Sequence, residues 1–271
     1  MPENAEGARG MPIRFFGELE RGDSVKYSIG FLVLGSLYWD THPVRKRWRK
    51  EFFSPDSHVK VHAPIRYGRL SRCRDETYTM VVSKELDGDP STLGECVFVP
   101  SNFSITSPES LVNHAEALWD AERKKSGAEA ISAKWGSVGL LVRPESGIAP
   151  ELLDGWKRRV KQEKHYGTID ALDGFGERTM ISRKDGTVDI AWPQTTSRQS
   201  LDVDLALVVA TNPELKGCDY PDPTTIASAW NKSPAQVDYF KKNAYFGICT
   251  FQDDDIEKVL NCPDFSKRSI P

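Results

Sequence analysis

The sequence predicts a mixed α/β (α+β) fold in which strands and helices are interleaved irregularly along 271 residues. Two observations favour this fold class. Short stretches rich in aliphatic and aromatic residues, some alternating with polar ones, are typical of strands. Other stretches begin with a Ser-Pro pair, which supplies an N-cap and a first-turn proline to a helix. Because these stretches follow no regular βαβ order, we expect a mixed sheet or barrel rather than a doubly wound parallel sheet.

Eight stretches are predicted to be extended. The first contains the apolar run Phe31–Leu34 and ends at Gly35-Ser36, where the glycine turns the backbone so that N–H groups can face an anion. The second alternates apolar and mostly polar positions from Val59 to Tyr67. The eight ranges are 29–36, 59–67, 77–83, 94–100, 136–143, 178–182, 187–192 and 203–211.

Six helices are predicted from their start signals and apolar spacing. Ser107-Pro108-Glu109 supplies an N-cap, a first-turn proline and a first-turn acid, and Ser233-Pro234 repeats the start signal. The acidic run Asp253–Asp255 fits the first turn of a helix better than a calcium loop. The ranges are 42–51, 108–124, 151–164, 223–231, 235–243 and 253–261.

Composition predicts a cytoplasmic protein with no membrane or nucleic-acid partner. The 36 Lys and Arg against 39 Asp and Glu give a net charge of −3, so there is no general basic field. No apolar run reaches the roughly 20 residues that cross a bilayer, and the N-terminus lacks a hydrophobic signal core. The basic run Arg45–Lys50 is interpreted as a solvated helix face anchored by Trp48, with nucleic-acid binding as the alternative.

Metal and disulfide sites are not expected. The five cysteines are odd in number and have no C-x-x-C spacing, and the five histidines show no ligand spacing. A carboxylate stands out instead. At about 100° per residue, Glu122 falls in the apolar stripe of Leu111, Ala115 and Leu118. A carboxylate facing the core must be paired, hydrogen-bonded or protonated, so Glu122 is either a general acid–base or a rim residue paired with a lysine or arginine.

Three motifs resemble the γ-glutamyl cyclotransferase-like superfamily, over roughly residues 29–145. Leu34–Asp40 is similar to the bacterial signature G-Y-G-S-L-I-W-D, although Leu34 stands where that family has an aromatic residue. Tyr67–Arg72, followed by the 78–82 strand, is similar to its arginine-serine segment. The stretch Leu118–Glu122 is similar to the helix that ends in the catalytic acid of those proteins.

The resemblance implies a cyclotransferase-like β-barrel with flanking helices and a C-terminal helical extension. We therefore expect a flexible lead-in over 1–24 and one such domain over 25–271. Within this domain, 145–202 is longer than the family requires and is predicted to be an insertion, and 220–271 is predicted to be helical.

The implied reaction closes a five-membered lactam, releasing 5-oxoproline and an amine from a γ-glutamyl amide. The resemblance makes Glu122 the catalytic acid–base. It assigns binding of the substrate α-carboxylate to the Gly-Ser-Leu loop. Arg69 and Arg72 are expected to bind a second carboxylate or to orient Glu122, with solvated surface arginines as the alternative. The candidate substrate-binding residues are Gly35, Ser36, Leu37, Tyr38, Arg69, Ser71 and Arg72. The expected partner is a small molecule with a carboxylate, with no metal and no organic cofactor. A non-catalytic amino-acid or anion binder on the same fold is the alternative, and homo-oligomerisation is left open.

Overall fold

The computed structural model describes residues 25–54, 58–71, 76–166, 185–197, 199, 201–214, 219–232 and 234–260. It confirms a mixed α/β fold. The predicted lead-in, the strand at 178–182 and the candidate site residue Arg72 lie outside the described residues. Among the described residues, no helix combines the length and the apolar character needed to cross a membrane.

The fold is organised around a seven-stranded sheet with the order β6-β7-β9-β1-β5-β2-β8. Strands β1 and β9 at its centre run parallel, and the other neighbours are antiparallel. Strands β3 and β4 form a separate two-stranded ribbon. The strands are β1 (Ile29–Val33), β2 (Val59–Ala63), β3 (Ile65–Ser71), β4 (Thr77–Val82), β5 (Gly94–Pro100), β6 (Ser132–Ala133), β7 (Gly136–Val142), β8 (Gln194–Thr195) and β9 (Leu205–Thr211).

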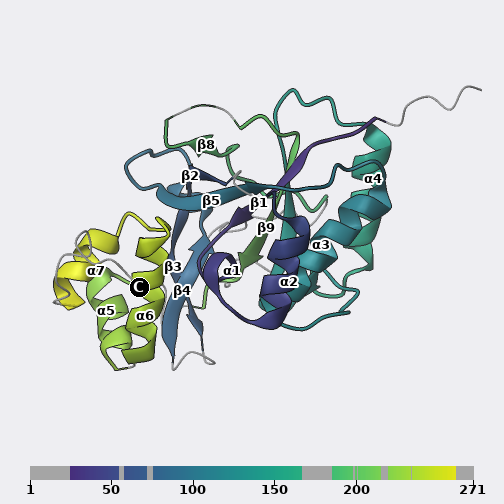
Figure 1. Ribbon diagram of the computed structural model, residues 1–271. Coiled ribbons are helices and arrows are strands. Elements are labelled where there is room, and N and C mark those ends of the chain that lie inside the picture. The colour runs from purple at the N-terminus through teal and green to yellow at the C-terminus, as the bar shows by residue number, and fades with distance from the viewer. Residues whose placement is uncertain are drawn as a thin grey trace, which may run out of the picture.

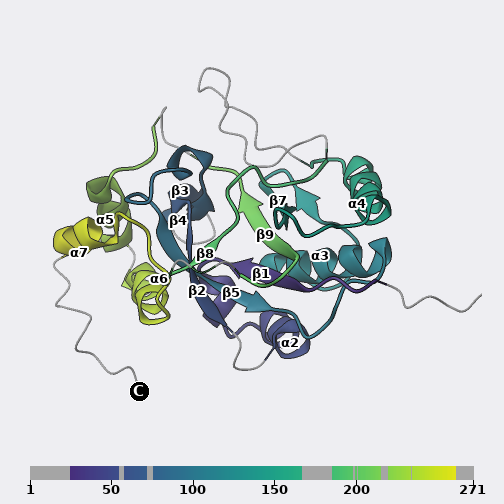
Figure 2. The same cartoon turned by 90° about the horizontal axis from the view of Figure 1, so that it is seen from above.

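The helices form two groups on opposite sides of the strands (Figures 1 and 2). The first group is α2 (Pro43–Phe52), α3 (Pro108–Arg123) and α4 (Pro150–Gln162). The second group lies beside the β3–β4 ribbon and is α5 (Pro223–Asn231), α6 (Pro234–Tyr245) and α7 (Asp253–Leu260). Two short elements complete the described fold, α1 (Ser36–Trp39) and the 3-10 helix η2 (Lys84–Leu86).

The core forms where the central strands meet the first helical group. All five residues of β1 are buried. The Phe31 ring, which is fully buried, meets Trp48 of α2 edge-on at 5.2 Å between ring centroids. Burying large aromatic side chains on both sides of this contact fixes α2 against β1. The chain that follows β1 is bound to α2 as well, because the Arg49 side chain donates to the Leu37 and Asp40 carbonyls.

Several predicted elements differ from the structure at their ends. The six predicted helices are confirmed to within two residues at each end. The stretch 59–67 is two strands rather than one, because Pro64 has no N–H to donate and interrupts the pairing. The predicted strand 187–192 is wrong. It contains two isolated bridge residues, Thr187 and Val188, of which Thr187 pairs with Leu140.

The first strand is shorter than predicted, and the barrel is not seen. β1 ends at Val33, and Ser36 already begins α1, because Gly35 turns the chain out of the extended conformation. The hydrogen-bonded order of the large sheet ends at β6 on one side and β8 on the other, and the described residues form no closed barrel.

Candidate active site

A cavity of about 800 Å³ lies where the parallel strands β1 and β9 end. Ligands commonly bind outside the carboxyl ends of parallel strands. Five of the candidate catalytic and substrate-binding residues line this cavity. They come from the loop after β1, from the ribbon strand β3 and from the end of α3: Ser36, Leu37, Arg69, Ser71 and Glu122. The fold thus brings three sequence motifs to one place.

Gly35 makes the turn that leads from β1 into the cavity wall. Its φ of 55° and ψ of −136° are readily adopted only by glycine. A Cβ at this position would lie 2.5 Å from the hydroxyl of Tyr239, a residue of α6 that also lines the cavity. Glycine is therefore required here both by the backbone conformation and by the close approach of Tyr239.

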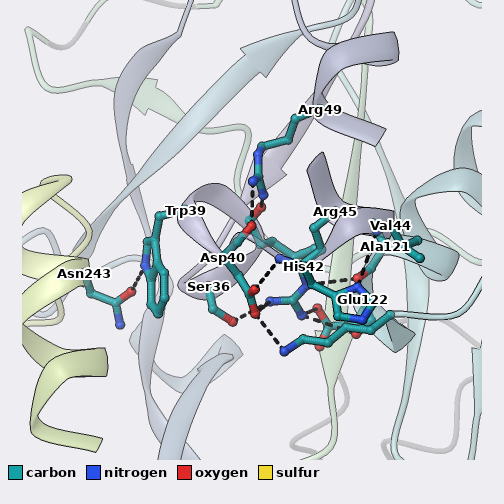
Figure 3. A network of polar contacts seen from close by, with 12 residues as sticks. Ser36, Trp39, Asp40, His42, Val44, Arg45, Arg49, Ala121, Glu122 and Asn243 are labelled. Atoms are coloured by element: carbon teal, nitrogen blue, oxygen red, sulfur yellow. Dashed lines mark hydrogen bonds and ion pairs between the residues drawn. The ribbon is translucent and has the colours of Figure 1, made fainter. Parts of the chain in front are cut away.

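Arg45 of α2 connects the loop after β1 to the end of α3 (Figure 3). Its side chain is 2% exposed. The guanidinium donates to the Ser36 hydroxyl at 2.7 Å and to the Asp40 carboxylate at 3.1 Å. It also donates to Glu122 Oε2 at 3.3 Å and to the Ala121 carbonyl at 2.9 Å. A guanidinium presents five N–H donors in a rigid fork, which lets one side chain hold both segments.

The basic run Arg45–Lys50, predicted to be a solvated face of α2, is only partly exposed to solvent. Lys46, Arg47 and Lys50 are exposed, but Arg45 is buried. Arg49 is half-buried and donates to two carbonyls in the α1 segment, at 2.6 and 2.7 Å. The interpretation of Trp48 as a buried anchor is confirmed, because its side chain is 3% exposed.

The sequence contains a pattern that indicates burial of Arg45. Arg45 stands three residues before Trp48 and seven before Phe52, which is the spacing of one helix face. The positive charge of an arginine usually favours solvent, but this face also carries two aromatic residues. An arginine in such a stripe is expected to be buried when carboxylates or carbonyls are within reach.

Glu122 lies at the rim of the cavity rather than in the core. It is in the last turn of α3, which stays helical to Arg123 and ends at Lys124 in the left-handed conformation. The Glu122 side chain is 22% exposed and is paired with Arg45. The interpretation of Glu122 as a rim residue paired with an arginine is therefore confirmed, and its carboxylate also lines the cavity. The acid–base role stays a prediction.

Asp40 joins the same network from the end of α1. Its carboxylate contacts Lys124 Nζ at 2.7 Å as well as Arg45. Burial raises the pKa of this carboxyl. Hydrogen bonds from Lys124 and from the His42 N–H, together with the charge of Arg45, outweigh burial and lower the pKa to about 2. Asp40 is therefore ionised throughout the physiological range and balances the positive charge beside Ser36.

Arg69 and Tyr38 have surroundings that the sequence did not reveal. Arg69 donates to the carbonyls of Trp135 and Asn212, each at 3.2 Å. The arginine that contacts Glu122 is Arg45. Tyr38 is not among the described residues that line the cavity. Its ring packs against His58 and Phe246, with centroids 5.9 and 5.4 Å away.

The cavity combines cationic groups that suit an anionic ligand with two carboxylates. Its lining includes the cations Arg45, Arg69, Arg123 and Lys124, the acids Glu122 and Glu214, and apolar residues of β1, β4 and β9. The described residues contain no group of three or more His, Cys, Asp or Glu side chains placed to hold a metal ion. No protein-family model, curated protein or solved structure matches this chain.

Proposed function

We propose that this protein is a γ-glutamyl cyclotransferase-like enzyme that cleaves a γ-glutamyl amide into 5-oxoproline and an amine. The observation that carries the proposal is the shared cavity. Ser36 and Leu37 of the signature-like loop line it together with Glu122, although the loop and the helix end are far apart in sequence. The β-barrel of that superfamily is part of the proposal, because the resemblance implies it.

In this reaction the substrate's own α-amino nitrogen attacks its γ-carbonyl carbon. A new C–N bond closes the five-membered lactam, and the original amide C–N bond breaks. The α-ammonium loses one proton before attack, and the same nitrogen loses a second as the ring forms. The leaving nitrogen takes up both protons and departs as an ammonium. One carboxylate beside the reacting atoms serves both transfers, and we assign this role to Glu122. No electron is transferred, and no co-substrate is consumed.

The rest of the cavity orients the substrate for ring closure. The substrate α-carboxylate lies beside the Gly35–Leu37 loop, where the buried guanidinium of Arg45 supplies positive charge 2.7 Å from the Ser36 hydroxyl. Holding the carboxylate fixes the amino group relative to the γ-carbonyl. An oriented intramolecular attack needs little covalent help from the protein.

A second candidate function is a non-catalytic binder of the same class of ligand. One contact favours it: Glu122 already pairs with Arg45 at 3.3 Å, as a purely structural carboxylate does. Such a protein gains thermal stability from γ-glutamyl compounds without releasing any product.

The test is a panel of γ-glutamyl amides incubated with the purified protein, with 5-oxoproline and free amine followed by NMR. The proposal predicts equal amounts of the two products. Isomers with the amide at the α-carbonyl are the control, because their amino group cannot reach that carbonyl to close a five-membered ring. Stabilisation by the panel without product would select the binder, and neither product nor stabilisation would reject both functions.

A further inference from the structure

The cavity contains an aromatic wall that the proposed ring closure does not use. Trp135 lies between β6 and β7 and lines the cavity. One face of its indole stacks on Trp119 of α3, with centroids 4.7 Å apart and planes inclined by 23°. Trp119 is fully buried, so the pair forms a fixed surface rather than a mobile side chain.

The backbone of Trp135 is also held in place. Its carbonyl accepts hydrogen bonds from the Asn212 N–H at 2.8 Å and from the Arg69 guanidinium at 3.2 Å. The Arg69 guanidinium carbon lies 5.4 Å from the Trp135 ring centroid, within the range of a cation–π contact. A planar group entering the cavity therefore meets an indole and a guanidinium in a fixed arrangement.

Apolar side chains extend this wall. Leu34 directly after β1, Met80 of β4 and Val209 of β9 line the same cavity. Pockets of roughly 300–1,000 Å³ hold ligands of drug size, and this one measures about 800 Å³. A γ-glutamyl group alone is far smaller, and its charged amino and carboxylate groups gain nothing from an apolar wall.

We infer that the amine released from the substrate carries an aromatic ring, which binds against Trp135 and Arg69. The inference rests on the proposed function, because it assigns the glutamyl part to the Ser36–Arg45–Glu122 end of the cavity. It adds the chemical class of the other half of the substrate. Both π-stacking and cation–π contact favour a planar ring over an aliphatic chain of similar size.

The first arm of the test compares γ-glutamyl-2-phenylethylamine with γ-glutamyl-hexylamine. We expect kcat/KM for the aromatic substrate to exceed that for the aliphatic one by about tenfold in the wild type, which corresponds to about 1.4 kcal/mol. Trp135→Ala should abolish this preference, and Trp135→Phe should retain most of it. Phe103→Ala removes an exposed ring that does not line the cavity and should leave the preference unchanged. Equal kcat/KM values in the wild type would overturn the inference.

The second arm needs no turnover. Calorimetry measures binding of free 2-phenylethylamine, and we expect Trp135→Ala to weaken it at least about tenfold relative to the wild type and Trp135→Phe. Thermal unfolding of each variant checks that the fold is intact. Absence of any 5-oxoproline would reject the proposed function, whereas wild-type failure to bind the amine would reject the aromatic subsite alone. Unchanged binding in a folded Trp135→Ala variant would also reject the subsite.

Discussion

Asp40 and Asp253 are the same residue type in two shielded places, and their carboxyl pKa values move in opposite directions. Asp40, at the cavity, has its pKa lowered to about 2 by Lys124 and Arg45 in spite of burial. Asp253, the buried first residue of α7 in the C-terminal helical group, has its pKa raised to about 7, chiefly by burial. The nearby charge of Asp254 raises it further, and two hydrogen bonds from Thr250 only partly offset this.

The difference shows which region is arranged to hold charge. At the cavity, a buried guanidinium links two carboxylates and a hydroxyl, so negative charge is stable there. Around Asp253, the neighbouring Tyr67 hydroxyl is fully buried and burial raises its pKa well above the usual value. The surroundings of Asp253 and Tyr67 therefore favour neutral side chains, and we interpret them as part of the packed interior rather than as a binding site.

Removing Arg45 should have the largest effect, because it leaves Asp40 and Glu122 without their shared buried cation. Arg45→Met keeps much of the side-chain length but none of the donors. We expect a loss of about 5 kcal/mol in the free energy of unfolding, measured with urea. Arg47→Met, an exposed position on the same helix, should change stability by no more than about 0.5 kcal/mol. Similar values for the two variants would mean that Arg45 does not hold the cavity together.

Asp253 should make the protein less stable as the pH rises, which is the opposite of the effect expected from Asp40. Its folded-state pKa of about 7 exceeds the unfolded value of 3.8, so the folded state retains a proton that the unfolded state loses. Stability from this group is complete below about pH 4 and is lost as pH rises through 7, by up to about 4 kcal/mol. Asp253→Asn keeps an oxygen for the Thr250 bonds and removes the titration. The free energy of unfolding, measured at pH 4, 6 and 8, should therefore change less with pH in the variant than in the wild type. An equal change with pH in the two proteins would contradict this account.

Asp40 should have a smaller effect on the free energy of unfolding, and this effect should change with pH only at low pH. Its folded-state pKa of about 2 lies below the unfolded value of 3.8, so its contribution is complete above about pH 4 and is lost as pH falls through 2. We expect Asp40→Asn to cost about 1 to 2 kcal/mol at pH 7, because solvent screens part of the attraction. The difference from wild type should shrink toward pH 2. A constant difference at all pH values would show that lost packing, rather than charge, is responsible.

The sequence predicted the helices well because their signals are local. Ser107 caps α3 through its side chain, with Pro108 in the first turn, and three acids open α7 as expected. Strands were less predictable, because pairing joins distant segments. The edge strands β6 and β8 have only two residues each and leave no periodic pattern to detect.

The candidate site was predicted in its loop and its carboxylate, but not in what surrounds them. Glu122 was found because its position in a helical stripe is a local property. Tyr239 and Trp135 line the cavity through tertiary packing alone, and nothing in their sequence neighbourhoods distinguishes them. Arg45 had a usable signal, yet its burial depends on acceptors contributed by α1 and α3.

The central claim is that the Glu122 carboxylate at the cavity moves protons during ring closure. The most direct test is the rate of 5-oxoproline release by Glu122→Gln, beside Glu116→Gln as a matched control. Glu116 is on the same helix, has a similarly exposed side chain and pairs with Arg159 at 3.1 Å, but it does not line the cavity. We predict a fall in kcat of about 100-fold or more for Glu122→Gln and no change for Glu116→Gln. Wild-type turnover by a folded Glu122→Gln variant would contradict the assignment.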